Sequence, residues 1–575
     1  MKRDLRWFEN NSYDVIVIGG GVYGAFVLWE AALRGLSVAL FEKGDFGGAT
    51  SANSLKVIHG GLRYLQRGDI TRFRTSIQER NTLLAIAPHL VAPLPVVIPA
   101  YGHGMLGREA MQIAATMSNI ICRDILDTCA KDVRLPGSRF VSRGECLELF
   151  PDLPDDGLTG GLLTYDAQAM NPERLVLSVI QSAVFRGAHV ANYAEVTGCL
   201  WRGNTVKGVT VRDRLSGDSL SVTGNMVINT AGPWVNTLLE KAGLQVANGL
   251  PGYTKAVNLV VRNFLADHAL GVKAQRKAGS KPTNSAQRMF FAAPWRETSL
   301  IGTAYFKAET DPDRVAVTEV DISALLDSFN RAYPAAGLTR DDVRLVHVGL
   351  VPTERSSNTA FEPTPAKQHT FRDHRLDGVF GIISIIGEKF TTARHVAEQV
   401  VDTVIRLWEK EPSPSRSAMT PLHDGRIENF PQFVELERKT LTCCFSADSI
   451  QMLAHDYGTA IGRVLAYYSD LGVVRSDDLA RIDLLKARIR YAVIEESAVH
   501  LSDVVFRRTG LGTVGFPGDY LMNICALEMA DLIGWDEARA QNEIANVQQD
   551  YANKGSHVVR IDTAPAGTPV HTLDS

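Results

Sequence analysis

The stretch KVIHGGLRYLQRGD, residues 56–69, carries an unusual density of residues that can do chemistry. His59 can accept or donate a proton near neutral pH, and Arg63 can bind an anionic group through several hydrogen bonds. Tyr64 adds an aromatic hydroxyl, and two adjacent glycines let the backbone come close to a flat ligand. This combination is typical of a loop that wraps a bound ligand, so the elements before and after it must indicate which ligand that is.

A nucleotide-binding fingerprint precedes this stretch. Residues 13–18, YDVIVI, read as a buried parallel strand, and Gly19, Gly21 and Gly24 follow it at the GxGxxG spacing. A helical pattern begins at once, and the next apolar strand ends in Glu42, 18 positions after the last glycine. The glycines permit a tight turn, a close approach to a pyrophosphate and close helix–strand packing, and Glu42 can accept hydrogen bonds from a ribose. The pattern predicts a βαβ unit that binds a dinucleotide at a helix N-terminus.

Two later segments indicate which dinucleotide is bound. Residues 226–236 read as a late strand that returns beside the first and ends in a glycine turn, and residues 381–405 read as another strand, turn and helix. A nicotinamide enzyme usually completes its nucleotide domain in one continuous piece. Segments this far apart in the chain favour a large, tightly held cofactor such as FAD.

Several longer motifs occur together and in a consistent order. They are VIGGGVYGA, ATSANSLKVIHGGLRYLQRGD, APHLVAPLP, INTAGPWV, APWRETSLIGT, GEKFTTARHVAE and IRYAVIEESAVHLSDVVFRRTGLG. Over nearly its whole length the chain resembles the FAD-dependent glycerol-3-phosphate dehydrogenases and oxidases of the D-amino-acid-oxidase-like flavoprotein superfamily. The resemblance implies hydride transfer from a secondary alcohol carbon to flavin N5, which yields a ketone, with electrons then passed to a quinone or to oxygen.

The expected fold class is α/β plus α. It combines a Rossmann-like FAD-binding domain of the GR2 type with an inserted antiparallel-sheet substrate domain and a C-terminal helical domain. The linker KEPSPSRSAMTP, residues 410–421, is expected to lead into the helical part. We expect residues 13–100, 175–245 and 370–410 in the FAD-binding domain, 101–174 and 246–369 in the substrate domain, 425–555 in the helical domain and 556–575 in a flexible tail.

The resemblance also implies roles for individual residues. Lys389 is expected near both flavin and substrate, Arg63 and Tyr64 at the substrate, and His59 in the loop around the flavin; these four are the catalytic candidates. No metal site is expected, and the FAD is expected to be noncovalent. The residues expected to hold FAD are Gly19, Gly21, Gly24, Glu42, Thr50, Ser51, Ser54, Lys56, His59, Gly60, Gly61, Val196, Ala231, Gly232, Trp234, Gly387, Lys389, Phe390 and Thr391.

Three positions in the substrate half depart from the family pattern. Val351, in GLVP, stands where the family carries an arginine that anchors substrate, and Asn258 stands where it carries a histidine. Tyr305 stands where the family tends to have an aspartate. A lost guanidinium removes charge-assisted hydrogen bonds of about 1.5–3 kcal/mol each, unless Arg344, Arg355 or Lys255 compensates. We therefore expect a larger or less anionic relative of glycerol 3-phosphate, such as a modified polyol or a polyol phosphate ester.

Two other function classes remain open from the sequence. The first keeps the flavin but oxidises an amine or amino-acid C–N bond, as elsewhere in the superfamily, with Arg63 pairing a carboxylate. The second is a flavin-binding protein without turnover. Reduction of the flavin by amines alone, or by no substrate at all, would distinguish them from alcohol oxidation.

Composition excludes some partners. The net charge of −4 gives no reason to expect nucleic-acid binding, and the seven cysteines form no CxxC pair or Cys/His cluster, which favours reduced thiols in the cytoplasm. The apolar segment within residues 101–126 leaves open a peripheral contact at the inner face of the membrane. A homodimer is also left open.

Overall fold

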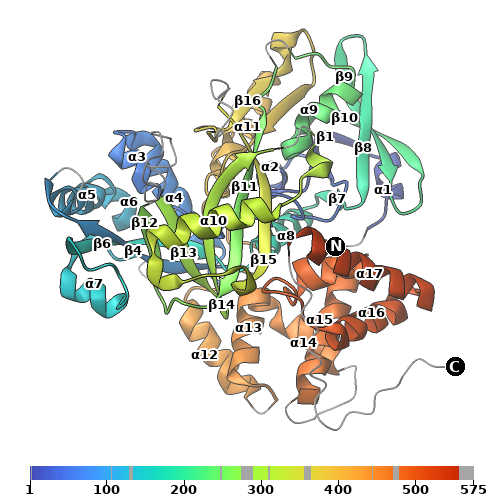
Figure 1. Ribbon diagram of the computed structural model, residues 1–575. Helices are drawn as coiled ribbons and strands as arrows, with labels where there is room; N and C mark the ends of the chain where they lie inside the picture. The colour runs from blue at the N-terminus through green and yellow to red at the C-terminus, as the bar shows by residue number, and fades with distance from the viewer. Residues whose placement is uncertain are drawn as a thin grey trace.

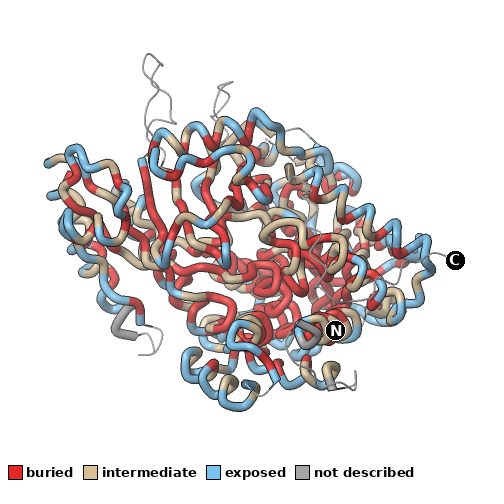
Figure 2. Tube along the Cα trace, turned by 60° about the horizontal axis from the view of Figure 1, so that its bottom comes forward, coloured by how far each residue is buried: buried red, intermediate tan, exposed pale blue. Residues whose placement is uncertain are grey.

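The computed structural model describes residues 1, 3–104, 107–128, 134–246, 249–273, 289–308, 311–354, 364–442, 444–469 and 478–555. Two β-sheets lie next to each other, and the C-terminal helices lie below them in the view of Figure 1. The buried residues concentrate where these three parts meet, whereas the outer helices carry the exposed positions (Figure 2).

The first sheet carries the predicted nucleotide-binding unit. β10 pairs in parallel with β1 on one side and with β17 on the other, and β2 continues the sheet beyond β1. This confirms that the late segments 226–236 and 381–405 return to the sheet of the first strand. Its strands are β1 (Ser12–Ile18), β2 (Val38–Phe41), β7 (His189–Ala191), β8 (Ala194–Arg202), β9 (Thr205–Asp213), β10 (Ser219–Asn229), β16 (Thr370–Asp373) and β17 (Ile382–Ile386).

Helices cover both faces of this sheet. α2 (Val22–Leu33) packs between α8 (Pro172–Val184) and α11 (Ala393–Leu407), and Tyr23 is its one residue that is not buried. α9 (Val235–Lys241) packs on the opposite face. Because side chains alternate along a strand, successive residues of β1 enter the two different apolar clusters. This burial on both faces explains why the strand reads as a nearly continuous apolar run.

The second sheet is largely antiparallel, as predicted for the substrate domain, with one parallel pair between β4 and β12. The helix α10 (Glu319–Ala332) packs its apolar side on this sheet. The strands are β3 (Val57–Ile58), β4 (Val91–Tyr101), β5 (Arg139–Ser142), β6 (Leu158–Ala169), β11 (Tyr253–Arg262), β12 (Ala269–Lys273), β13 (Met289–Trp295), β14 (Thr298–Lys307) and β15 (Val343–Pro352).

The C-terminal part is helical, as predicted. One cluster of apolar side chains joins α15 to α17 with residues of β11, β14 and β15, so this part packs directly on the second sheet. The elements are α12 (Phe430–Leu441), α13 (Ala447–Tyr457), α14 (Ile461–Ser469), α15 (Asp478–Glu495), the π-helical turn η10 (Asp503–Arg508), α16 (Asp519–Ile533) and α17 (Glu537–Asn553).

Some predicted boundaries differ from the observed pairing. β4 belongs to the second sheet, although residues up to 100 were expected in the FAD-binding domain. Its pairing with β6 is not visible in its own sequence. Residues of the predicted linker 410–421 pack on the rest of the protein, since Ser417 is buried and Arg416 donates to the carbonyl of Leu33. The division into separate domains stays a prediction, and the tail 556–575 lies outside the described residues.

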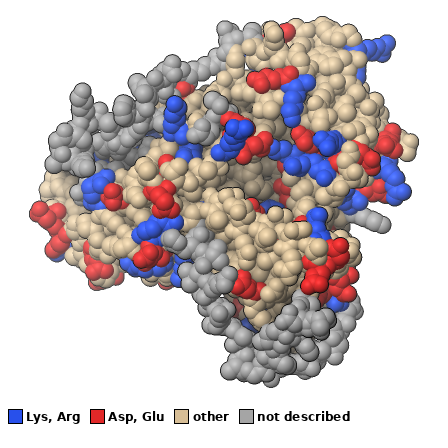
Figure 3. Space-filling view, turned by 45° about the vertical axis from the view of Figure 1, so that its right-hand side comes forward, with Lys and Arg blue, Asp and Glu red and all other residues tan. Residues whose placement is uncertain are grey.

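The apolar segment within 101–126 forms two helices, α5 (Arg108–Ile121) and α6 (Arg123–Thr128), beside α3 (Leu62–Gln66) and α4 (Ile70–Ile86). Within the described residues, no helix has both the length and the apolar character needed to cross a membrane. Acidic and basic side chains are interspersed on the face shown in Figure 3, in keeping with the small net charge.

Candidate active site

One large cavity lies between the loops of the first sheet and the second sheet. Its volume is about 940 Å³, near the upper end of the range for ligand and cofactor pockets. Of the residues predicted for cofactor or substrate, Gly24 is the one that does not line it. The predicted residues that do are Gly19, Gly21, Glu42, Thr50, Ser51, Ser54, Lys56, His59, Gly60, Gly61, Arg63, Tyr64, Val196, Ala231, Gly232, Trp234, Asn258, Tyr305, Val351, Gly387, Lys389, Phe390 and Thr391.

We call the part of the cavity formed by the first sheet its nucleotide side, and here the glycine fingerprint sets the geometry. Gly19 has a φ of +102°, and a Cβ there would lie 2.7 Å from the carbonyl oxygen of Thr230. A Cβ on Gly24 would lie 1.8 Å from the carbonyl oxygen of Gly19. Gly24 therefore permits the predicted close packing of α2 on the sheet, and it does so without facing the cavity.

Glu42 is held rigidly on the nucleotide side. Its Oε2 accepts a hydrogen bond from the backbone N–H of Gly20 at 2.6 Å, and its Oε1 accepts one from Gly44 at 2.8 Å. Burial raises the pKa of this carboxyl, against the effect of the two backbone donors. The fixed carboxyl, the N-terminus of α2 and the space between them fit a dinucleotide such as FAD.

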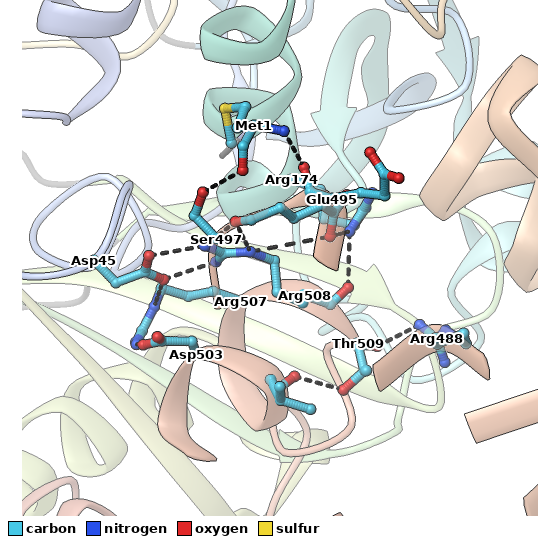
Figure 4. Close-up of polar contacts among 12 residues, drawn as sticks. Met1, Asp45, Arg174, Arg488, Glu495, Ser497, Asp503, Arg507, Arg508 and Thr509 are labelled. Carbon is cyan, nitrogen blue, oxygen red and sulfur yellow. Dashed lines mark hydrogen bonds and ion pairs between the residues drawn. The ribbon is translucent and has the colours of Figure 1, made fainter. Parts of the chain in front are cut away.

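Asp45 connects the nucleotide side to the C-terminal helical part (Figure 4). Its carboxylate accepts hydrogen bonds from Arg507 Nε at 2.5 Å and from two nitrogens of Arg508 at 2.7 and 2.8 Å. Burial alone would raise the pKa of Asp45, but the two guanidinium groups hold it well below its usual range. Arg507 also lines the cavity, so the helical part contributes to its wall. Sequence reasoning missed this contact because 462 positions separate the partners.

We call the part formed by the second sheet and residues 56–67 the substrate side, and the loop of residues 387–391 closes it. Tyr23 of α2 supports this loop, because its hydroxyl donates to the carbonyl of Lys389 at 2.9 Å. A Cβ on Gly387 would lie 1.9 Å from the Tyr23 ring, so glycine is required there. Tyr23 was not predicted, although it lies within the fingerprint itself.

The ammonium group of Lys389 lies 4.0 Å from the centre of the Tyr64 ring and 3.6 Å from Glu388 Oε1. Burial lowers the pKa of Lys389 to about 8 and raises that of Glu388 to about 7. Both groups can therefore change charge close to physiological pH. Perturbed titratable groups in a cavity wall are typical of a catalytic site.

His59 is paired through its ring. His59 Nδ1 lies 3.1 Å from Asp166 Oδ2, and Asp166 Oδ1 accepts a hydrogen bond from the N–H of Gly60 at 2.6 Å. The ring packs against Phe291, with 5.1 Å between ring centres. Asp166 was missed because it lies 107 positions from His59, on another strand of the sheet.

Lys56 behaves differently from its neighbours in the stretch. Its φ of +60° turns the side chain into the protein, where the ammonium group lies 3.5 Å from Glu173 Oε1 and 4.7 Å from the centre of the Trp295 ring. Burial lowers its pKa. Lys56 borders the cavity as predicted, but its charge is directed to Glu173.

The three divergent positions lie on adjacent strands of the substrate side. Asn258 Oδ1 accepts a hydrogen bond from the Thr303 hydroxyl at 2.7 Å, next to an irregularity in the pairing of β11 and β14. Tyr305 follows on β14 and Val351 lies on β15, and all three residues line the cavity.

Of the three cations considered as replacements for the arginine, the two that the structure describes do not line this wall. Lys255 Nζ lies 2.6 Å from Asp321 Oδ2, and neither Lys255 nor Arg344 lines the cavity. Arg355 lies outside the described residues. Lys367, which sequence reasoning missed, does line the cavity, and its ammonium group lies 2.7 Å from Glu354 Oε1.

Known proteins are similar to this chain in sequence and in fold. The family described as FAD dependent oxidoreductase matches residues 14–403, and the C-terminal domain of alpha-glycerophosphate oxidase matches residues 423–540. The chain is 34% identical to glycerol-3-phosphate dehydrogenase from Synechocystis over 559 residues, which cover 94% of this chain and 97% of the relative. It is 30% identical to glycerol-3-phosphate dehydrogenase from Mycobacterium leprae over 554 residues, covering 95% and 89% of the two chains.

A solved structure agrees with this relationship. The glycerol-3-phosphate dehydrogenase from Bacillus halodurans, complexed with FAD, matches with a TM-score of 0.74 and 25% identity, covering 97% of this chain and 98% of that one. The predicted cofactor, fold class and enzyme class are thereby confirmed. The chain belongs to the FAD-dependent oxidoreductase family, within its group of glycerol-3-phosphate dehydrogenases.

Proposed function

We propose that this enzyme oxidises the secondary alcohol of a glycerol 3-phosphate-like polyol to a ketone. One observation carries the proposal: His59, Arg63, Tyr64 and Lys389 line the same cavity as the dinucleotide fingerprint. Such an oxidation requires the alcohol carbon to be held at the cofactor, the hydroxyl proton to leave and developing charge to be stabilised. The substrate side of the cavity offers a candidate side chain for each requirement.

The fingerprint, Glu42 and residues 387–391 would hold FAD, which when bound supplies the acceptor for the hydride of the alcohol carbon. Arg63 is proposed to bind the anionic group of the substrate. The ammonium group of Lys389, supported over the Tyr64 ring, is proposed to stabilise negative charge beside it. His59 is proposed to accept the hydroxyl proton.

We propose further that the substrate carries less charge than a free phosphate monoester, as a phosphodiester of a polyol does. Val351 offers no hydrogen-bond donor from its side chain, and Lys255 is committed to Asp321. The nearby Lys367 is neutralised by Glu354. Arg63 and Lys389 are then the main cations proposed for the substrate.

Anaerobic bleaching of the bound flavin tests both proposals. The panel would contain glycerol 3-phosphate, glycerol phosphodiesters, free polyols and amino acids. We expect the phosphodiesters to reduce the flavin with a higher kcat/KM than glycerol 3-phosphate. Equal or better reduction by glycerol 3-phosphate would refute the substrate proposal alone, whereas reduction by amino acids alone would refute alcohol oxidation.

For the electron acceptor we propose a quinone, reached at the inner face of a membrane from the cytoplasmic side. The support is α5, whose Ile113, Met117 and Ile120 are 63%, 42% and 63% exposed at helical spacing. Ser118, from the same helix, lines the cavity. An apolar face on a cavity-lining helix suits an enzyme that exchanges electrons with a lipid-soluble acceptor.

Sedimentation with vesicles that contain anionic lipid tests this contact. We expect the wild-type enzyme to sediment with the vesicles and Ile113→Ser/Ile120→Ser to remain in solution, with unchanged flavin reduction. A matched Val320→Ser change, at a 77% exposed position on α10, should leave sedimentation unchanged. Rapid reoxidation by oxygen, with hydrogen peroxide formed and no quinone reduced, would favour an oxidase instead.

A further inference from the structure

The pair of His59 and Asp166 has the geometry of an oriented proton acceptor. His59 Nδ1 lies 3.1 Å from Asp166 Oδ2, and within the described residues His59 Nε2 has no hydrogen-bond partner. The His59 side chain is 37% exposed and lines the cavity, whereas the Asp166 side chain is 14% exposed. One ring nitrogen is thus engaged inside the protein, and the other is left available.

Asp166 is itself fixed by its surroundings. The N–H of Gly60 donates to Oδ1, and Arg80 Nη1 lies 3.9 Å from the same oxygen while donating to the carbonyl of Tyr165. Burial alone would raise the pKa of Asp166, but the hydrogen bond and charge of His59, together with Arg80, hold it below its usual value. Asp166 is therefore an acceptor-only carboxylate, and the proton in the hydrogen bond must lie on His59 Nδ1.

We propose that Asp166 is a positioning residue, which keeps His59 protonated at Nδ1 so that Nε2 receives the hydroxyl proton of the substrate. This rests on the proposed function. The O–H proton passes to Nε2 and gives an imidazolium that Asp166 stabilises. FAD, when bound, would accept the C–H hydride with its electron pair as the carbon–oxygen double bond forms. Asn258, another polar residue predicted at the substrate, cannot accept this proton because an amide is not a base near neutral pH.

Among the described residues, the pair of His59 and Asp166 has charged neighbours. Asp166 on β6 is paired with His59, and Arg80 on α4 lies close to Asp166. Phe291 on β13 packs against the His59 ring and carries no charge. Arg63 and Lys389 share the cavity wall. Their positive charge opposes formation of the imidazolium, which makes the carboxylate behind the ring more important.

Asp166→Asn is the direct test. The N–H of Gly60 requires the amide oxygen on its side, so the amide NH₂ would face Nδ1 and force the ring proton onto Nε2. We expect flavin reduction to slow about 100-fold, and the acid limb of the pH profile to move to lower pH because the imidazolium loses its partner. FAD content should not change, and Asp155→Asn, which removes an exposed partner of Arg143, should change neither readout.

Two further measurements separate positioning from a merely structural role. In a His59→Asn background, Asp166→Asn should cause no further loss, since both changes remove the same function. Nitrogen NMR of ¹⁵N-histidine-labelled enzyme should show His59 protonated at Nδ1 in the wild type and at Nε2 in Asp166→Asn. Additive losses, an unmoved acid limb or an unchanged tautomer would overturn the proposal. The tautomer decides it even if no polyol reduces the flavin, a result that would count against the proposed function instead.

Discussion

The two sides of the cavity differ in how firmly their charged groups are held. On the nucleotide side, Asp45 is fully buried and bonded to Arg507 and Arg508, and both oxygens of Glu42 accept backbone hydrogen bonds. On the substrate side, Lys389 is 29% exposed and pairs loosely with Glu388. Burial moves the pKa values of these two groups to about 8 and about 7.

This difference matches the demands of the two tasks. A tightly held cofactor needs groups that keep one charge and one position, and saturated buried ion pairs supply both. Proton and hydride transfer need groups that can change charge near the working pH. With the proposed roles, the two requirements are met on different sides of one cavity, and the following changes should affect one side without the other.

Asp45→Asn should have the largest effect. It leaves Arg507 and Arg508 buried with one carboxylate fewer, a loss of about 3–5 kcal/mol in the free energy of unfolding. FAD affinity should fall as well, because Arg507 lines the cavity. Thermal unfolding and FAD titration of the apoprotein measure these losses, with Asp531→Asn on the exposed side of α16 as the matched control. Normal stability and FAD affinity in Asp45→Asn would show that the nucleotide side does not depend on this buried ion pair.

Lys389→Met should affect the substrate side. Removing a cation that stabilises developing charge slows catalysis by about 10²–10³-fold. We expect such a loss in the rate of flavin reduction, with FAD content and thermal stability nearly unchanged. Lys439→Met, at a 73% exposed position on α12, should be neutral. A loss of FAD without a loss of intrinsic rate would assign Lys389 to cofactor binding instead.

The pH dependence should also come from the substrate side. Because the pKa of Lys389 is lowered to about 8, its ammonium form is complete well below pH 8 and is lost as pH rises through that value. At pH 9 about a tenth of the cation remains, so flavin reduction should be about tenfold slower than at pH 7. Lys389→Arg should remove this alkaline limb, since a guanidinium keeps its charge. An alkaline limb that persists unchanged in the arginine variant would assign it to another group.

Much of the nucleotide side could be predicted from the sequence, because a fingerprint such as Gly19 to Gly24 is short and carries its own physical reason. The pairing of Asp166 with His59 and the support of Lys389 by Tyr23 could not be predicted. They depend on which strands and helices become neighbours, and 107 and 366 positions separate the partners. The pairing of β4 with β6 in the second sheet could not be predicted for the same reason. The direction of the Lys56 side chain depends on a positive φ that a lysine seldom adopts.

The last expected effect is a gain in substrate affinity. Val351→Arg adds a guanidinium to the substrate side, and one charge-assisted hydrogen bond of about 1.5 kcal/mol corresponds to roughly a tenfold lower KM for glycerol 3-phosphate. Val351→Gln, which adds length without charge, is the matched control. An unchanged or higher KM in the arginine variant would mean that the substrate's anionic group lies elsewhere.

The proposed reaction oxidises an alcohol carbon at the cavity whose residues fit FAD. It is tested most directly by anaerobic stopped-flow reduction of the bound flavin with glycerol 3-phosphate or its phosphodiester, each deuterated at the alcohol carbon. We expect the flavin to be bleached and deuterium to slow the bleaching, because the C–H bond breaks in that step. Bleaching by amino acids alone, or by no alcohol at all, would contradict it.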